Sequence, residues 1–124
     1  TGLLWTTASD LARFNLQVTR ALTGDSDLIS EELARQLTLP SSTETRTLGF
    51  YIGNKDAQTE AEGGYIFHTG SNIGYLTLSI ISKDGQHGAV ILINVSPEWD
   101  ASEYPQFAFI TETLADINQL YNWR

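Results

Sequence analysis

The sequence predicts an α+β fold of the α/β/α sandwich type: an antiparallel sheet of three to four strands, with N-terminal helices and a C-terminal helix packed on it. Apolar residues recur at helical spacing over 11–22, which is typical of a helix with one buried face. They alternate with polar residues over 75–82, which favours a half-buried antiparallel strand. Apolar residues recur again at helical spacing over 107–121.

The first helix is expected to begin after Thr7. The hydroxyl of this residue stands three positions before Asp10, the spacing of a capping box with aspartate in place of glutamate. Gly24 is typical of a helix C-terminal stop. The buried stripe is predicted to consist of four apolar residues, Leu11, Phe14, Val18 and Leu22.

A second, shorter helix is expected after Ser30. Two glutamates follow this N-cap candidate in the first turn, where the helix dipole favours negative charge. Pro40 is expected to end the helix. Its inward face is predicted to be formed by Leu33 and Leu37.

The strands are expected in the middle of the chain. Residues 48–53 and 64–67 predict two of them, separated by a polar loop at 54–63. A third covers 75–82. The fourth, 88–95, is apolar on both faces, so it is expected to lie centrally in the sheet.

Two further signals place the turn and the last helix. An Asp-Gly pair within 83–86 predicts a hairpin turn. After Pro97, the last helix is expected to be capped by Asp100 or Ser102, with Pro105 in its first turn. Its stripe across one face of the sheet is predicted to comprise Phe107, Ile110, Leu114, Ile117 and Tyr121.

Composition indicates one globular domain spanning 1–124, with 41% hydrophobic and 18% charged residues. The formal net charge of −8 argues against nucleic acid as a partner. No apolar run is long enough to span a bilayer. The absence of cysteine excludes disulfides and thiol catalysis. There is no methionine, even at position 1, so we expect Thr1 to be an internal residue of a longer protein.

The chemistry-bearing residues gather at His68, Thr69 and Gly70, directly after the predicted strand 64–67. A basic ring, a hydroxyl and an unhindered backbone at a strand edge suit a carboxylate or a carbonyl. The competing interpretation is a structural histidine, the commoner role of a lone histidine at a strand end. His68 and Ser71 form a weak candidate for a base and nucleophile, because no third group orients the imidazole.

Metal and cofactor binding are not expected. The chain has two histidines, and neither stands at a spacing typical of a metal site. The chemistry of the residues by itself therefore favours a strand edge that binds a ligand but lacks a nucleophile of its own.

Two blocks of sequence carry a family resemblance. Residues 2–14, GLLWTTASDLARF, are followed downstream by residues 68–74, HTGSNIG. Together they resemble the serine β-lactamase and penicillin-binding-protein superfamily, in particular the class C-like branch with its D-Ala-D-Ala carboxypeptidases, D-aminopeptidases and esterases. The second block is similar to the Lys-Thr-Gly motif of that superfamily, which reads His-x-Gly in many relatives.

The resemblance implies roles for individual residues. His68 would present a basic group to the substrate, and Thr69 would donate a hydrogen bond to its carboxylate or carbonyl. Gly70 would keep the strand edge open, and Asn72 would contact the substrate. The backbone N–H of Ser71 would be one of two oxyanion-hole donors. Because imidazole is largely neutral near pH 7, histidine in place of lysine favours peptidase or esterase chemistry over β-lactamase activity.

The same resemblance implies that part of the active site is missing. The family carries its nucleophile in Ser-x-x-Lys, but neither Lys55 nor Lys83 has a serine three positions earlier. Neither Tyr75 nor Tyr121 belongs to a Tyr-x-Asn motif. We therefore expect this chain to be the C-terminal part of such a domain, with the N-terminal half as its partner and a small-molecule or peptide substrate. A periplasmic or secreted location is favoured by the resemblance.

The alternative is a stand-alone, non-catalytic binding module built from the same half-domain. In the family, the strand that corresponds to 88–95 pairs with a strand from the N-terminal part. Without that partner, its edge would be exposed, and self-association through this strand is expected.

Overall fold

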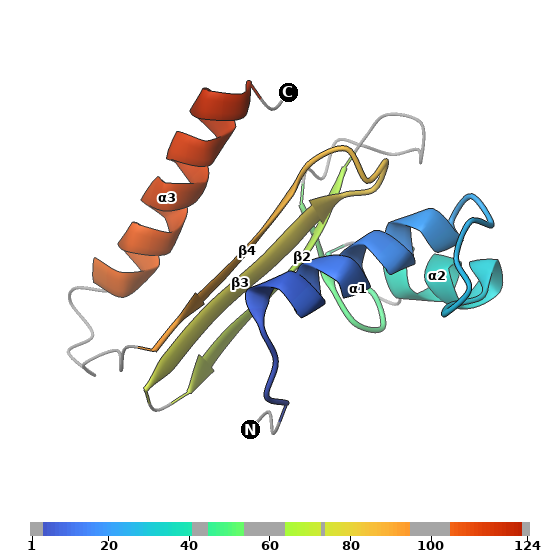
Figure 1. The fold of residues 1–124 in the computed structure, drawn as a ribbon, viewed down its shortest axis with the longest axis horizontal. Coiled ribbons are helices and arrows are strands. Elements are labelled where there is room, and N and C mark those ends of the chain that lie inside the picture. The colour runs from blue at the N-terminus through green and yellow to red at the C-terminus, as the bar shows by residue number, and fades with distance from the viewer. Residues whose placement is uncertain (1–3, 41–44, 54–63, 73, 95–104, 123–124) are drawn as a thin grey trace.

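The computed structural model describes residues 4–40, 45–53, 64–72, 74–94 and 105–122. In this part of the chain, three helices accompany a four-stranded antiparallel sheet, which confirms the predicted α+β class (Figure 1). The elements are α1 (Ala8–Ala21), α2 (Glu31–Thr38), β1 (Tyr51–Gly53), β2 (Tyr65–Asn72), β3 (Tyr75–Ser82), β4 (Gly88–Ile93) and α3 (Pro105–Tyr121).

The strands follow one another across the sheet in the order β1-β2-β3-β4, and each neighbouring pair is antiparallel. The tight turn after β2 contains Gly74 at φ +84°, a conformation that glycine adopts without steric cost. The turn between β3 and β4 contains Gly85 at φ +71°, where the Asp-Gly pair predicted a hairpin turn. The predicted hairpin is therefore confirmed.

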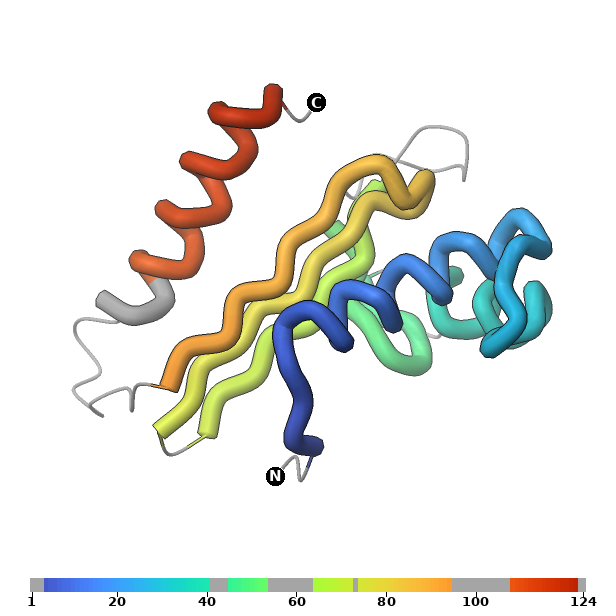
Figure 2. The backbone as a smooth tube through the Cα atoms, viewed as in Figure 1, coloured from blue at the N-terminus to red at the C-terminus, as the bar shows by residue number. Residues whose placement is uncertain are grey.

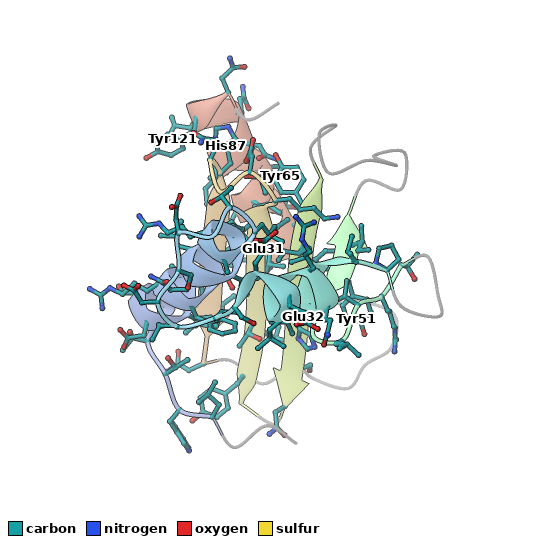
Figure 3. The ribbon with its side chains drawn as sticks, turned by 90° about the vertical axis from the view of Figure 1, so that its right-hand side faces the viewer. Glu31, Glu32, Tyr51, Tyr65, His87 and Tyr121 are labelled. Atoms are coloured by element: carbon teal, nitrogen blue, oxygen red, sulfur yellow. The ribbon has the colours of Figure 1, made fainter. Side chains whose placement is uncertain are left out.

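Helices cover both faces of the sheet. Figure 3 shows α1 and α2 in front of the sheet and α3 behind it. Figure 2 shows the backbone of the same three layers from the side. The core on the α1 side is formed by Val18, Phe50, Ile66 and Ile81. The core on the α3 side is formed by Leu76, Leu78 and Ile110.

The ends of α1 form as the sequence predicts. The Thr7 hydroxyl oxygen accepts a hydrogen bond from the Asp10 N–H at 3.1 Å, and the hydroxyl donates to Asp10 Oδ2 at 2.8 Å. Arg13 adds a 2.8 Å ion pair with the same carboxylate. The predicted N-cap at Thr7 is therefore confirmed, although the Asp10 carboxylate accepts from the Thr7 hydroxyl rather than from the Thr7 backbone N–H as in a capping box. Gly24 follows the helix at φ +79°, so the predicted stop is confirmed as well.

The buried face of α1 differs from the predicted stripe: of the four predicted residues only Val18 is fully buried, and the other buried residues are Asn15, Thr19 and Ala21. Phe14 is 45% exposed, whereas Asn15 is only 2% exposed. Asn15 lies between Leu11 and Val18 on the inward side, and its Nδ2 donates to Ser79 Oγ on β3 at 2.7 Å. A pattern based on apolar residues selects Phe14 and overlooks a polar residue that is hydrogen-bonded inside.

The inward face of α2 is also different. Ser30 caps the helix as predicted, accepting from the Leu33 N–H at 3.2 Å. Leu33 is nevertheless 45% exposed, and the buried residues are Ala34 and Thr38. Only Leu37 of the two predicted leucines packs against the core.

Two predicted strand boundaries are wrong. The strand expected over 48–53 begins only at Tyr51, because Thr47 holds residues 47–50 in a turn: its backbone N–H donates to the Phe50 carbonyl at 2.9 Å, and its hydroxyl oxygen accepts from the Phe50 N–H at 2.8 Å. The strand expected to end at Phe67 continues to Asn72.

β4 lies at the edge of the described sheet, so the expected central position is wrong for this part of the chain. α3 begins at Pro105 and lies against one face, as predicted. Along its stripe, Ile110 is buried and Leu114 packs on the core, whereas Tyr121 is 65% exposed. Four parts of the prediction lie outside the described residues: the 54–63 loop, Pro97, the Asp100 or Ser102 cap, and the side chain of Phe107.

Candidate functional site

All five sequence-predicted site residues lie in the last five positions of β2, which we call the β2 edge segment (His68–Asn72). The sequence placed His68, Thr69 and Gly70 after the end of a strand, and this is wrong because they lie within one. β3 imposes the extension, since it pairs with every residue of β2 from Tyr65 to Asn72. Apart from half-buried Gly70, the residues of the segment are exposed.

One side of the β2 edge segment is not covered by β1. β1 pairs only with Tyr65, Ile66 and Phe67. Further along β2, the described pairing is with β3 alone. The strand edge expected from the sequence therefore exists within the described sheet, but it runs along the flank of a strand rather than at its tip.

The ladder shows which backbone groups face this edge. The Lys83 N–H donates to the Gly64 carbonyl at 2.7 Å, in register with the β2–β3 pairs. Because such bonds alternate along an antiparallel pair, His68, Gly70 and Asn72 bond to β3. Thr69 and Ser71 consequently direct their N–H and C=O groups toward the uncovered side.

The side chains of the segment divide between the two faces of the sheet. His68 stands opposite Ser79, which contacts α1, whereas Thr69 stands opposite Leu78, which packs toward α3. Successive residues of a strand alternate in this way. The backbone of Thr69 and Ser71, rather than a set of converging side chains, is what the segment presents at its edge.

Glycine occupies position 70 for a structural reason that the sequence did not reveal. A Cβ atom at this position would lie 2.6 Å from Thr77 Oγ1 on the neighbouring strand. This is closer than real Cβ contacts, so the glycine makes room for the Thr77 side chain across the strand pair.

Aromatic and cationic side chains flank the start of the segment. The Tyr51 ring stacks on Phe67 at 5.5 Å between centroids and lies 5.7 Å from the His68 ring. The Arg46 guanidinium lies 4.8 Å from the Tyr51 ring centroid. Sequence reasoning missed Arg46 and Tyr51, because neither belongs to a recognisable motif and their proximity depends on the 47–50 turn.

A second aromatic pair lies at the other end of the segment. Asn72 pairs with Tyr75 across the hairpin. The Trp5 ring contacts the Tyr75 ring edge to face at 6.0 Å and is 82% exposed. The uncovered edge therefore extends between a cationic, aromatic end and a purely aromatic end.

A described carboxylate with a shifted pKa lies outside the β2 edge segment. The pKa of Asp84 is lowered from its usual 3.8 by hydrogen bonds from the Ser82 hydroxyl and then the Gln86 N–H, but this carboxylate lies in the β3–β4 turn, away from the segment. Within the described ranges, no group of three or more histidine, aspartate or glutamate side chains is arranged to hold a metal ion.

None of the described helices is long and apolar enough to cross a bilayer.

These positions define a candidate site that can hold a carbonyl or an anion by backbone N–H groups beside an imidazole. A nucleophile of the Ser-x-x-Lys type is absent from the sequence. Comparison with protein-family models, with curated proteins and with solved structures found no match for this chain.

Proposed function

We propose that this chain is the C-terminal part of a serine hydrolase domain of the β-lactamase and penicillin-binding-protein type, as its motif resemblance suggests. It contributes one wall of an acyl-transfer site, and the nucleophile is supplied by polypeptide outside these residues. The substrates would be peptides, amides or esters. The observation that carries the proposal is the outward direction of the Thr69 and Ser71 N–H groups along an uncovered strand edge beside His68.

The backbone geometry suits this reaction. When a serine oxygen attacks a carbonyl carbon, the C=O electron pair moves onto the carbonyl oxygen, and a fixed N–H stabilises that negative charge. The N–H of Ser71 is available for this role because it is directed away from β3. Collapse of the tetrahedral species then expels the leaving group, which takes a proton, and the acyl group stays on the serine until water removes it.

The test removes the Ser71 N–H alone. Ser71→Pro deletes this donor without breaking the β2–β3 ladder, since the N–H faces the other side, where proline is tolerated in strands. In the longer polypeptide of the same reading frame, we expect Ser71→Pro to slow labelling by a fluorophosphonate probe about 10²-fold, the usual effect of losing one oxyanion donor. Ser71→Ala keeps the N–H and should label at nearly the normal rate.

Two controls make the outcome decisive. The isolated 124-residue chain should not react with the probe. The upstream reading frame should encode Ser-x-x-Lys, and mutation of that serine should abolish labelling. A reactive isolated chain, or equal labelling of Ser71→Pro and Ser71→Ala, would overturn the proposal.

A second candidate function, a self-associating binding module, is favoured by β4. The Ser82 N–H donates to the His87 carbonyl at 2.7 Å, so by alternation Gly88, Val90 and Leu92 direct their backbone groups to the outer edge of the described sheet. Two copies could pair these edges with Val90 on the two-fold axis. Sedimentation velocity should then show a concentration-dependent dimer, and a monomer over the whole concentration range would exclude this candidate.

A further inference from the structure

Resting on the proposed hydrolase function, we infer that Tyr51 is a positioning residue: its ring holds the imidazole of His68 at the uncovered edge of β2, beside the outward N–H of Thr69. No motif pointed to this tyrosine. Its role follows from its place at the end of the β1–β2 pairing and from the two rings that it contacts on β2.

Tyr51 lies at the corner where β1 stops covering β2. It pairs with Phe67, and within the described sheet no residue of β1 pairs with His68 or with the rest of the β2 edge segment. The 47–50 turn comes directly before it, and Phe50 anchors this turn in the core on the α1 side, where it is only 9% exposed. The backbone of Tyr51 is therefore fixed next to the first residue of the segment.

The Tyr51 ring contacts two side chains that leave β2 on opposite faces of the sheet. It stacks on Phe67 at 5.5 Å between centroids and lies 5.7 Å from the His68 ring. Phe67 packs on the α3 side, and successive residues of a strand alternate, so His68 leaves the backbone on the α1 side. A ring near both lies at the flank of the strand, and Figure 3 shows Tyr51 at one side of the sheet. The imidazole is therefore turned toward the flank that β1 leaves uncovered.

This orientation places the imidazole where the backbone donors point. The next N–H along the chain, that of Thr69, is directed to the same uncovered side. An imidazole N–H can donate to the carbonyl or carboxylate of a ligand that also accepts from this backbone group.

Tyr51 supplies a restraint that the exposed position of His68 would otherwise lack. An exposed side chain samples several rotamers, and a ligand that needs one of them must order the side chain as it binds. Among the described residues, the Tyr51 ring is the one in contact with the imidazole. Contact with this ring orders the imidazole before the ligand arrives, so less conformational freedom is lost on binding.

NMR of the 124-residue chain tests the position of the imidazole. In the wild type we expect NOEs between the ring protons of Tyr51 and His68, and Hα–Hβ couplings of His68 that report a single χ1 rotamer. Tyr51→Phe keeps the ring and should keep both signals. Tyr51→Leu removes the ring and should average the couplings over several rotamers. Averaged couplings in the wild type, or unchanged couplings in Tyr51→Leu, would overturn the inference.

Tyr65→Leu is the matched control. Tyr65 is a half-buried tyrosine of the same strand pair, opposite Gly53, and no ring contact with His68 is among the described ones. The variant loses a ring of the same size and should leave the His68 couplings unchanged. Equal averaging in Tyr65→Leu and Tyr51→Leu would indicate general loosening of the strand pair and would overturn the inference. Because the wild-type couplings alone can refute it, the inference stays testable if Tyr51→Leu unfolds.

A double-mutant cycle in the longer polypeptide tests whether Tyr51 acts through His68. His68→Ala should slow fluorophosphonate labelling about 10²-fold, the lower end of the contribution of a positioned acid or base. Tyr51→Leu should slow it about tenfold, because the imidazole is present but misplaced, whereas Tyr51→Phe should label at nearly the normal rate. Added to His68→Ala, Tyr51→Leu should cause no further loss. The same tenfold loss in both backgrounds would overturn the inference.

The failure of this inference and the failure of the hydrolase proposal give different results. Labelling that depends on the Ser71 N–H but not on Tyr51 would keep the hydrolase and overturn the inference. A longer polypeptide that never labels would refute the hydrolase and, with it, the part of Tyr51 in the reaction. The NMR couplings would still decide whether Tyr51 holds the imidazole.

Discussion

Asn15 connects α1 to the sheet through a single buried hydrogen bond. Its Nδ2 donates to Ser79 Oγ, while its Oδ1 is buried and has no hydrogen-bond partner within the described residues. The position could not be predicted, since sequence patterns assign inward sites to apolar side chains. The Thr7 cap was predictable, because it depends only on residues three positions apart.

The Asn15–Ser79 pair predicts non-additive mutations. Ser79→Ala removes the acceptor and leaves a buried amide without it, so we expect a loss of about 1–3 kcal/mol in the free energy of unfolding. Asn15→Leu combined with Ser79→Ala replaces both polar groups and should be more stable than Ser79→Ala alone. Urea denaturation of the single and double variants measures this, and strictly additive losses would contradict the interpretation.

Asp84 predicts a stability difference that depends on pH. Hydrogen bonds from Ser82 and Gln86 lower the folded pKa of Asp84 below the usual 3.8. The contribution of Asp84 to the free energy of unfolding is therefore complete above that value and is lost as pH falls through the folded pKa. Because this carboxylate is exposed and solvent screens its interactions, Asp84→Ala should cost only about 0.5 kcal/mol at pH 7. The gap from wild type should stay constant down to about pH 5 and narrow below pH 3.8. Denaturant curves between pH 7 and pH 2 check this, and a constant gap would contradict it.

At the scale of elements, β2 and β3 show where local signals fail. Thr69, Gly70 and Ser71 resemble turn residues, so the sequence suggested that the strand ends before them. β3 has strong alternation, and pairing with it draws all eight residues of β2 into the sheet. The hairpin at Gly85 was predictable because turn chemistry is local. The length of β2 was not predictable, because pairing with β3 determines that length.

Gly70 and Thr77 predict a rescue experiment on this strand pair. Gly70→Ala would place a Cβ atom 2.6 Å from Thr77 Oγ1 and should destabilise the protein by about 1–3 kcal/mol. Adding Thr77→Ala removes the obstructing hydroxyl and should recover much of that loss. Gly53→Ala is the matched control, since its Cβ would meet only an ordinary contact at 3.5 Å. Thermal unfolding compares the three, and a failure of Thr77→Ala to rescue would exclude this cause.

At the scale of the whole molecule, the layers were predictable and the order of the strands was only partly so. Amphipathic patterns indicate that each helix covers a sheet, and Figure 1 shows helices on both sides. The apolar character of β4 suggested a central strand, but the described sheet places it at an edge. Candidate-site residues were found by motif, whereas Arg46 came near them only through tertiary folding.

The exposed edge of β4 predicts an effect of charge on self-association. No residue of β4 is charged, although lysine on edge strands is a common protection against pairing. Leu92→Lys should therefore keep the protein monomeric at concentrations where the wild type dimerises. Leu48→Lys adds the same charge at a residue that is 68% exposed in the 47–50 turn, and it should still dimerise. Identical sedimentation of both variants would argue against pairing through β4.

The order of the strands has a consequence for how the chain folds. Each strand pairs with its neighbour in sequence, so the sheet forms by closing short loops, which is kinetically fast. Docking of α1 is different, because the bond from Asn15 to Ser79 joins residues 64 positions apart. We expect the meander of β2, β3 and β4 to form early and α1 to dock late. The β2 edge segment would then exist before the rest of the molecule has closed around the sheet.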